Sequence, residues 1–457
     1  MRPRVLRHPL GRWVDPAEAF DALFGDATDA FWLDSGANAV RGRSYLGAGS
    51  RTVTAEAVGG SVLEYLGAEL ATSRLDDNGD GFALGWVGWI GYETRFETMD
   101  GAAAPAETAF LYVDRAIEFD HETREVTLLA LGETWADAVD WREDTVRSLT
   151  RNRSLRFSKG SVARSPLREP QGAVAPQGAG AVSPQGAVWR DSDAEYLAMI
   201  RACKAAIARG DAYQLCLTTL ATVDVAADPV ATYLALRAAS PSHHGGLIRI
   251  GEVSLLSSSP EQFLSVTPAG VVESRPIKGT RPRGATPDAD AALAAELVAS
   301  EKERAENLMI VDLMRNDISR VSRIGSVTVP SLLAVESYAQ VHQLVSTVRG
   351  ELADGLTGMD AVIACFPAGS MTGAPKSSAV RILDSLERHP RGIYSGAFGY
   401  FGLDGRIDLA MVIRSIVMTP TCATVGAGGG ITALSDPDEE LAEVKLKAAA
   451  LLRALGC

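Results

Sequence analysis

The sequence predicts a fold that mixes α-helices and β-strands, on three observations. Segments with helical periodicity and capping residues alternate with short apolar runs typical of strands. Asp404-Gly405 joins two strand-like segments, 395–403 and 406–418, as the turn of an antiparallel hairpin does. The chain of 457 residues is 46% hydrophobic and 22% charged, which is ordinary for two or three globular domains or one large two-layer unit.

Charge and cysteine usage exclude several classes of function. The formal net charge of −13 argues against a nucleic-acid backbone or an anionic membrane as the main partner. The five cysteines are scattered without a C-x-x-C pair, which fits a reducing compartment and argues against a zinc site. No run of about 18 apolar residues occurs. We therefore expect a cytoplasmic protein that neither binds nucleic acid nor enters a membrane.

Residues 1–150 are predicted to form a scaffold of strands and helices. Apolar runs at 31–36, 86–92 and 126–131 indicate strands, and no catalytic motif occurs among them. Residues 151–190 follow, in which Pro-Gln-Gly-Ala occurs three times. We expect this segment to be a flexible linker, because it cannot bury enough apolar surface to offset the entropy lost on ordering.

Order returns in the third portion, residues 191–457. A helix is predicted from the capping residues 191–193 to Gly210, and a strand follows over 211–217. A second helix is predicted over 291–314. A third begins at Asp436-Pro437, where aspartate caps the helix and proline occupies its first position.

The second and third of these helices each carry two glutamates three residues apart, Glu303 with Glu306 and Glu440 with Glu443. Each pair therefore lies on one helix face, where like charges repel unless a cation lies opposite. Four carboxylates without a neighbouring Cys/His cluster suit Mg²⁺, a hard cation that prefers oxygen ligands. Two solvated helix faces are the alternative interpretation.

Three basic residues have both a structural and a functional interpretation. Arg414 lies in the apolar run 409–417, so its guanidinium needs an anion, either a structural carboxylate or a substrate carboxylate. Lys447 is explained by a salt bridge four residues along the helix from Glu443. His342 is either a polar core residue or a ligand.

Two glycine-rich stretches are candidates for anion binding. The glycines of 426–430 allow backbone N–H groups to approach an anion, but a tight turn needs the same residues. The loop 366–376 leads into a helix, whose N-terminus is a natural anion site. The loop lacks the spacing of a nucleotide-binding P-loop.

A basic stretch, 273–284, has Lys278 between Pro276 and Pro282 and directly before Gly279. Proline fixes φ and glycine permits a positive φ, so the segment is predicted to be a specific loop or strand end that aims the lysine. By itself, the pattern is also typical of a basic surface turn.

Together with two further stretches these motifs resemble the chorismate-utilising enzymes, a family that includes anthranilate, aminodeoxychorismate, isochorismate and salicylate synthases. The resemblance covers about 191–452 and, more loosely, 1–150. It implies an α+β fold, a two-layer antiparallel β-sheet sandwich with helices packed outside, to which both halves of the chain contribute. The stretches that carry it are 210–214 (G-D-A-Y-Q), 259–261 (S-P-E), 276–281 (P-I-K-G-T-R), 304–317 (R-A-E-N-L-M-I-V-D-L-M-R-N-D), 372–376 (T-G-A-P-K) and Glu440-x-x-Glu443.

Within this family, Lys278 resembles the aminodeoxychorismate synthase branch, because the other branches have alanine or another small residue there. The resemblance implies that chorismate and ammonia give 4-amino-4-deoxychorismate, for para-aminobenzoate and folate, through a covalent lysine adduct at C2. Glu261 is implied as the acid that assists loss of the C4 hydroxyl. A lysine of ordinary pKa, near ~10.4, must be desolvated or placed beside a cation before it can attack. We expect Arg275, Arg281, Arg283 and the metal to contribute.

The resemblance also assigns the remaining site residues. Glu306 and Glu443 are implied as direct Mg²⁺ ligands, with Glu303 and Glu440 acting through water, and the metal is expected to anchor the ring carboxylate. Gln214 stands where water-using members carry a lysine, which argues against isochorismate or salicylate as the product. The positions implied to bind substrate are Gln214, Thr280, Arg315, His342, Thr372, Tyr394, Arg414, Gly428, Gly430 and Lys447.

Ammonia is expected from a separate glutamine amidotransferase subunit, because no amidotransferase triad occurs in this sequence. Two alternatives to this function stay open. One is anthranilate synthase component I, in which ammonia attacks C2 directly, although a lysine at position 278 obstructs that path. The other is a non-catalytic chorismate-binding regulator, which needs neither the nucleophile nor the acid.

Overall fold

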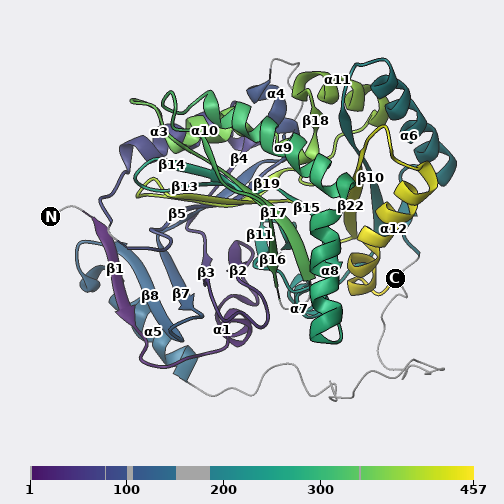
Figure 1. Ribbon diagram of the computed structural model, residues 1–457. Coiled ribbons are helices and arrows are strands. Elements are labelled where there is room, and N and C mark those ends of the chain that lie inside the picture. The colour runs from purple at the N-terminus through teal and green to yellow at the C-terminus, as the bar shows by residue number, and fades with distance from the viewer. Residues whose placement is uncertain (1–2, 78, 100–105, 151–185, 339–340) are drawn as a thin grey trace, which may run out of the picture.

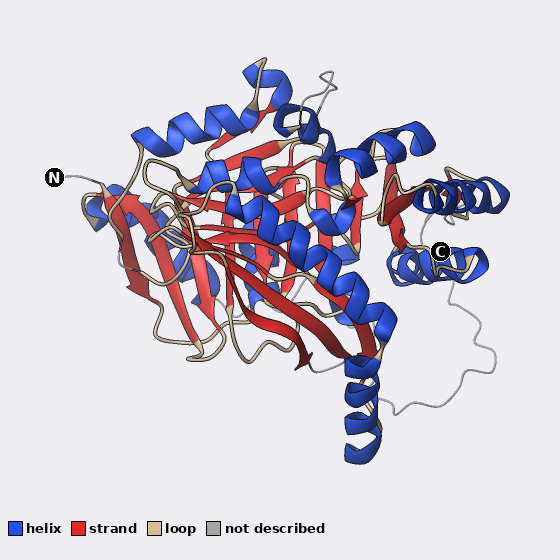
Figure 2. Cartoon of the chain, turned by 45° about the horizontal axis from the view of Figure 1, so that its top comes forward, coloured by secondary structure: helices blue, strands red, loops and turns tan. Residues whose placement is uncertain are grey.

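The computed structural model describes the chain except for residues 1–2, 78, 100–105, 151–185 and 339–340. The predicted linker therefore lies almost entirely outside the described residues. Two antiparallel sheets form the centre of the molecule, and helices lie outside them (Figures 1 and 2). This confirms the predicted α+β sandwich. No helix in the described part of the chain combines the length and the apolar character needed to cross a membrane.

The larger sheet has twelve strands, and β9 pairs with β10 beside the main path. In spatial order the strands are β1 (Arg4–Pro9), β8 (Glu125–Gly132), β7 (Arg115–Asp120), β3 (Arg43–Ala48), β2 (Ala30–Asp34), β11 (His244–Ile250), β12 (Val253–Ser259), β21 (Ser415–Met418), β22 (Cys422–Ile431), β10 (Gln214–Asp224) and β18 (Gly373–Ala374), with β9 (Val188–Trp189).

The smaller sheet has ten strands, and β16 pairs with β17 beside the main path. In spatial order they are β15 (Ile277–Pro282), β17 (Val341–Glu351), β14 (Val271–Ser274), β13 (Gln262–Val266), β20 (Ile407–Met411), β19 (Ala397–Gly402), β5 (Gly85–Ile90), β6 (Ala109–Val113) and β4 (Arg51–Thr54), with β16 (Thr328–Ser337).

Helices cover the outer faces of both sheets. The larger sheet is covered by α1 (Pro16–Phe24), α5 (Val139–Thr150), α6 (Asp193–Ala208), α7 (Pro229–Ala239), α11 (Lys376–Glu387) and α12 (Pro437–Ala454). The smaller sheet is covered by α3 (Val62–Thr72), α9 (Glu301–Ser319) and α10 (Gly358–Cys365). The remaining elements are α2 (Ala55–Val58), α4 (Arg95–Thr98), α8 (Pro287–Ala299) and the 3₁₀ turns η1 (Tyr92–Thr94), η2 (Trp135–Ala138) and η3 (Gly369–Met371).

Alternation along the strands produces this layering, because neighbouring side chains of a strand point to opposite faces. In β2, Trp32 packs under the helices of the larger sheet, while Phe31 packs between the two sheets. In β5, Trp86 packs under the helices of the smaller sheet, while Val87 packs between the two sheets. The core between the sheets thus combines residues from both halves of the chain.

The N-terminal portion is part of the same two sheets as the rest of the chain. β2 pairs with β11, and β5 pairs with β19. Residues 1–150 therefore share their cores with residues 191–457. The predicted role as scaffold fits this placement, since the strands of the N-terminal portion extend both sheets.

Several predicted elements are confirmed, among them the strands at 31–36, 86–92 and 126–131. The helix cap at Asp436 accepts backbone N–H bonds from Asp438 and Glu439. The helix predicted over 291–314 is wrong as a single element. It divides into α8 and α9 at Ser300, whose side chain accepts a bond from the Glu303 N–H and so caps a new helix.

Two further predictions need correction. The segment 406–418 is not one hairpin strand, because β20 belongs to the smaller sheet and β21 to the larger sheet. The chain crosses between the sheets at 412–414, where Arg414 has a φ of 51°. The glycines of 426–430 are not a tight turn but part of β22, between β21 and β10.

Candidate active site

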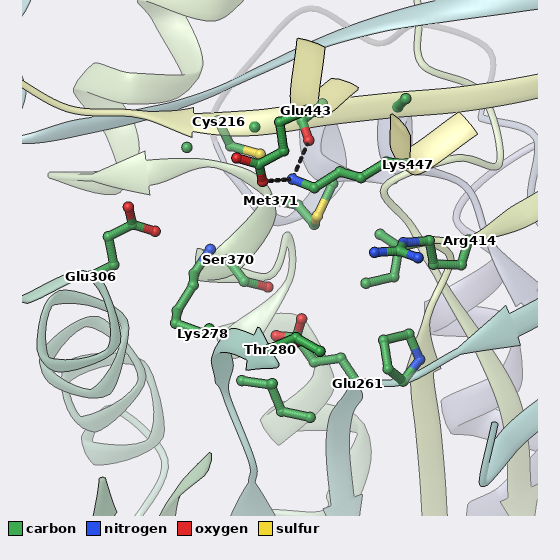
Figure 3. A pocket seen from close by; sticks show the side chains of 18 of the residues that line it. Cys216, Glu261, Lys278, Thr280, Glu306, Ser370, Met371, Arg414, Glu443 and Lys447 are labelled. Atoms are coloured by element: carbon green, nitrogen blue, oxygen red, sulfur yellow. Dashed lines mark hydrogen bonds and ion pairs between the residues drawn. The ribbon is translucent and has the colours of Figure 1, made fainter. Parts of the chain in front are cut away.

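A cavity of about 630 Å³ opens where the smaller sheet ends against the C-terminal strands and helices (Figure 3). Its walls come from β15, β22, α9, α12 and the turn η3. Segments more than 200 residues apart in the sequence, around 216 and around 443, meet there. The cavity is lined by most of the predicted site residues, namely Glu261, Lys278, Thr280, Glu303, Glu306, Tyr394, Arg414, Gly428, Gly430, Glu440, Glu443 and Lys447.

Lys278 reaches the cavity from an irregularity in β15. Ile277 pairs with Val345 and Thr280 with Gln343, and the register shifts between them. Gly279 inside the shift has a φ of +81°, which residues with a Cβ rarely adopt. The half-buried Lys278 side chain points into the cavity (Figure 3). The sequence pattern of a lysine before glycine is thus explained by a β-bulge.

The carboxylates of the cavity keep the Lys278 amine protonated. Burial lowers the pKa of Lys278, but the charges of Glu306 and then Glu261 outweigh burial and raise it above its ordinary value. In the protein without metal, Lys278 is therefore an ammonium. The expectation that Arg275, Arg281 and Arg283 activate it is not supported, because each is paired with a carboxylate. The partners are Glu336, Glu296 and Asp290, in that order.

Glu261 faces the same cavity from the segment after β12. It is 8% exposed, and the Met411 N–H donates to its backbone carbonyl at 3.0 Å. Burial raises the pKa of its carboxyl, while the nearby charge of Lys278 and a bond from Ser370 act in the opposite direction. A carboxyl with a raised pKa keeps its proton at higher pH and can donate it to a leaving group.

The four glutamates lie on the wall formed by α9 and α12. Glu306 and Glu440 are buried, and the ammonium of Lys302 lies 3.5 Å from Glu440. Lys447 lies 2.8 Å from Glu443, which confirms the predicted i,i+4 salt bridge. Burial raises the pKa of Glu443, but Lys447, Lys302 and Lys278 together outweigh burial and lower the pKa below its ordinary value.

Oxygen donors of this kind suit Mg²⁺, and all four line one cavity. Among the described residues, however, no three acidic, histidine or cysteine side chains lie close enough together to hold a metal ion. The lysine ammonium groups now balance these carboxylates. The Mg²⁺ site on this wall stays a prediction.

Arg414 occupies the crossover between the two sheets. The prediction that it is buried is wrong, because the residue is exposed, and its side chain points into the cavity (Figure 3). Burial lowers the pKa of Arg414, and the charges of Tyr394 and Glu443 act in the opposite direction, but Arg414 makes no ion pair with a carboxylate of the described residues. Of the two predicted anions, a structural carboxylate therefore does not pair directly with Arg414 among the described residues, and binding of a substrate carboxylate stays a prediction.

Tyr394 and the glycines of β22 form another wall of the cavity. The ring of Tyr394 lies directly over Gly426, where a Cβ would collide with it. At Gly428 a Cβ would come within 2.6 Å of the Leu217 carbonyl, and Lys447 donates to the Gly428 carbonyl at 2.9 Å. The glycines therefore allow strand, ring and lysine to approach closely beside the cavity.

Four residues predicted to bind substrate do not line the cavity. Arg315 is exposed on α9 and pairs with Asp312 at 3.2 Å. His342 is buried and lies 2.8 Å from the Ser337 hydroxyl and 2.9 Å from Asp290, as a polar core residue does.

Thr372 is also buried, and its hydroxyl donates to backbone carbonyls of its own turn. Gln214 is 1% exposed, and both polar atoms of its amide have no partner among the described residues. It packs against Gly430 at the edge of the cavity. The substrate-binding roles of these two residues stay predictions.

Other lining residues were not assigned a role from the sequence. They include Cys216, Lys302, Gln343, Ser370, Met371 and Leu446. Lys302 carries a signal that the sequence offers, since it lies between two glutamates of a predicted metal helix and four residues before Glu306. Ser370 lies in the rigid loop 366–376. Lys376 of this loop is the first residue of α11, and its ammonium pairs with Asp317 at 2.5 Å. Its charge is therefore already balanced by a carboxylate of the protein.

The sequence matches the family of chorismate binding enzymes over residues 28–453. It is 42% identical over 479 residues to an aminodeoxychorismate synthase of Streptomyces pristinaespiralis, covering 96% of this chain and 64% of that protein. It is 37% identical over 450 residues to anthranilate synthase component 1 of Streptomyces coelicolor, covering 97% of this chain and 86% of that protein.

The fold is similar to a solved structure as well. The crystal structure of anthranilate synthase component I from Streptococcus pneumoniae aligns with a TM-score of 0.70 at 26% identity, covering 98% of this chain and 92% of that one. The chain spans 64% of the length of the aminodeoxychorismate synthase that it matches, which is less than its coverage of the two anthranilate synthases.

Proposed function

Because the chain belongs to the family of chorismate binding enzymes, we propose that it converts chorismate and ammonia to 4-amino-4-deoxychorismate, the reaction of an aminodeoxychorismate synthase. The observation that carries the proposal is Lys278, which points into the cavity that Glu261 also lines (Figure 3). A nucleophile and an acid in one cavity provide the two functions that substitution at C4 with retention requires.

The reaction proceeds by two displacements. The neutral Lys278 amine forms a bond to C2 of chorismate, the ring double bonds shift, and the C4 hydroxyl leaves as water with a proton from Glu261. Ammonia then forms a bond to C4, the double bonds shift back, and the lysine leaves C2 as an amine. The proton that ammonia loses returns to the Glu261 carboxylate, so each residue ends as it began.

Substrate carboxylates are held on the far side of the cavity from α9. Arg414 makes no ion pair among the described residues and is free to bind one of them. Lys447 and the backbone of β22 at Gly428 lie on the adjoining wall, and together with Arg414 they form the proposed carboxylate-binding wall. Two anchored carboxylates orient the ring so that one face meets Lys278.

Mg²⁺ is the proposed cofactor, held by Glu306 and Glu443 directly and by Glu303 and Glu440 through water. Bound there, it supplies positive charge that anchors a substrate carboxylate. Glu306 is the strongest of the carboxylates that raise the pKa of Lys278, so a cation held by Glu306 would weaken that effect and favour the neutral amine.

Ammonia is proposed to come from a glutamine amidotransferase subunit, and the product to serve para-aminobenzoate and folate synthesis. All five cysteines are free, which fits the proposed reducing, cytoplasmic setting. With added amidotransferase, glutamine is expected to support turnover, whereas ammonium salts are expected to work with this chain alone. Turnover with glutamine by the purified chain alone would contradict the proposal that a separate amidotransferase subunit supplies ammonia.

The test of the proposed function is an intact-mass measurement after chorismate and Mg²⁺ are added without ammonia. The expected adduct has the mass of chorismate minus water and lies on Lys278. Lys278→Ala is expected to form no adduct and no 4-amino product. Lys278→Arg keeps the charge but provides no neutral amine, so it is expected to be inactive.

Anthranilate synthase activity is the second candidate, because relatives of that name cover nearly the whole chain. In Lys278→Ala, ammonia gains access to C2, and the 2-amino isomer or anthranilate becomes the expected product. Anthranilate as the main product of the unaltered protein, or 4-amino-4-deoxychorismate from Lys278→Ala at the original rate, would refute the covalent mechanism.

A further inference from the structure

The position of Lys278 depends on a β-bulge in β15, where fewer backbone hydrogen bonds hold the strand in place. Between the pairs Ile277–Val345 and Thr280–Gln343, β15 has two residues, 278 and 279, where β17 has only Leu344. A bulge of this kind interrupts the ladder of backbone hydrogen bonds and bends the strand. β15 also ends its sheet, so β17 is its only neighbour on the sheet's main path.

Asn307 of α9 lies against this interruption. It is fully buried, and its Nδ2 donates to the Pro276 carbonyl at 3.4 Å and to the Leu344 carbonyl at 3.3 Å. One carbonyl belongs to the residue before β15, and the other to the single residue of β17 opposite the bulge. The amide therefore joins the two strands at the place where their own pairing fails.

The orientation of this amide is fixed by its partners. Its Oδ1 accepts a bond from the Ser346 hydroxyl at 2.5 Å, while both carbonyls face Nδ2. The reverse orientation would place oxygen against two carbonyl oxygens. The Ser346 hydroxyl accepts the Leu333 N–H at 2.9 Å, and the Ser346 N–H donates to Pro276 at 3.1 Å. These groups form one closed network.

The same turn of α9 carries Glu303 and Glu306, which line the cavity. Glu306 lines the cavity, whereas Asn307, the next residue, points to the sheet. A displacement of α9 against β15 would change the separation of Lys278 from Glu306, whose charge has the largest effect on Lys278 after burial. The amide of Asn307 bridges these elements.

We propose that Asn307 is a positioning residue for Lys278. It holds the bulge of β15 against β17 and α9, so that the amine meets the substrate carbon and the carboxylates at fixed separations. The inference rests on the proposed function for its chemical consequence but not for its structural one. It differs from a plain buried hydrogen bond in predicting a local effect, confined to β15 and to the chemistry of Lys278.

The experiment compares Asn307→Ala with Ser322→Ala, which removes another buried side-chain bond at the C-terminal end of α9, to Ile318 at 2.8 Å. The rate of the Lys278 adduct with chorismate and Mg²⁺ is expected to fall about 10²-fold in Asn307→Ala, as for a misplaced reacting group. It is expected to change less than about threefold in Ser322→Ala. Binding of chorismate is expected to change little in both, since the carboxylate-binding wall is untouched.

Hydrogen exchange of the segment 277–282 gives a readout that does not depend on the reaction. Asn307→Ala is expected to speed exchange there and to leave β19 and β5 of the same sheet unchanged. An adduct rate equal to that of the unaltered protein, or a uniform rise in exchange across the sheet, would overturn the inference. If the unaltered protein forms no adduct, the proposed function fails, and exchange alone decides on Asn307.

If Asn307→Ala does not fold, Ser346→Ala decides, because it removes the bond to Oδ1, together with the acceptor of the Leu333 N–H, and keeps both bonds from Nδ2. Exchange that rises within 277–282 alone supports the inference. Exchange that is unchanged, or that rises across the whole sheet, refutes it.

Discussion

Replacing Arg391 tests how the buried interior holds the cavity in place. The side chain is 2% exposed, and its Nε and Nη2 donate to the Glu387 carboxylate at 2.8 and 2.7 Å. Nη1 donates to the Met371 carbonyl at 2.7 Å and Nη2 to the Cys216 carbonyl at 2.9 Å. Met371 and Cys216 both line the cavity, so the guanidinium supports its floor from behind.

The magnitude follows from burial. Arg391→Ala leaves the Glu387 carboxylate, itself 5% exposed, without its cation, and removing one partner of a buried pair costs about 3–5 kcal/mol. Arg391→Lys keeps the charge but loses the forked pairing. Because a hydrogen bond to a charged group contributes about 1.5–3 kcal/mol, the loss of two corresponds to about 3 kcal/mol or more.

The assay is the urea midpoint of the unaltered protein and of each variant, converted to an unfolding free energy. Arg315→Lys is the matched control, because Arg315 makes one exposed ion pair with Asp312, of a kind that contributes about 0–1 kcal/mol. In Arg391→Lys, the KM for chorismate is also expected to rise, since the cavity floor relaxes. If Arg391→Lys and the control differ by less than about 0.5 kcal/mol, the reasoning is refuted.

Four further predictions follow from the site. Glu306→Gln is expected to abolish turnover with unchanged circular dichroism, and full activity in excess chelator would contradict the role of a metal. Burial raises the pKa of Glu261, so the folded state binds this proton more tightly than the unfolded state does. Stability therefore falls as pH rises through the raised pKa. Glu261→Gln is expected to be inactive yet no less stable than the unaltered protein in urea at pH 8. Gly279→Ala introduces a Cβ at a φ of +81° and within 2.7 Å of Leu297, so urea unfolding is expected to show a loss of about 1–3 kcal/mol, with loss of adduct formation. Arg414→Ala is expected to raise the KM for chorismate at least tenfold, whereas Arg315→Ala is expected to leave it unchanged, and steady-state kinetics showing the reverse order would contradict the assignment of the carboxylate-binding wall.

Local signals in the sequence were sufficient for much of the secondary structure. The cap at Asp436 and the salt bridge between Glu443 and Lys447 involve residues a few positions apart, so their partners can be read from the chain. The cap at Ser300 was available too, but the continuous helical pattern on both sides concealed it. The motif around Lys278 likewise indicated the family, which the match over residues 28–453 confirms, whereas Lys278 as the nucleophile stays a prediction.

Tertiary structure decided the features that depend on distant residues. The bulge at Lys278 arises from pairing with β17, more than 60 residues later. At Arg414 the chain leaves the smaller sheet and enters the larger one. The apolar pattern over 409–417 is continuous and does not reveal this crossing. His342 meets Asp290 instead of the cavity, because α8 lies against β17.

The protonation of Lys278 shows the physical reason for this division. The sequence by itself determined that an amine stands before a glycine in a basic stretch, since this is a property of neighbouring residues. Its charge state depends on Glu261 and Glu306, which come from other parts of the chain and meet it only in the folded cavity. Covalent neighbours fix caps and turns within a few ångströms, whereas electrostatic fields and strand register sum over groups that only folding brings together.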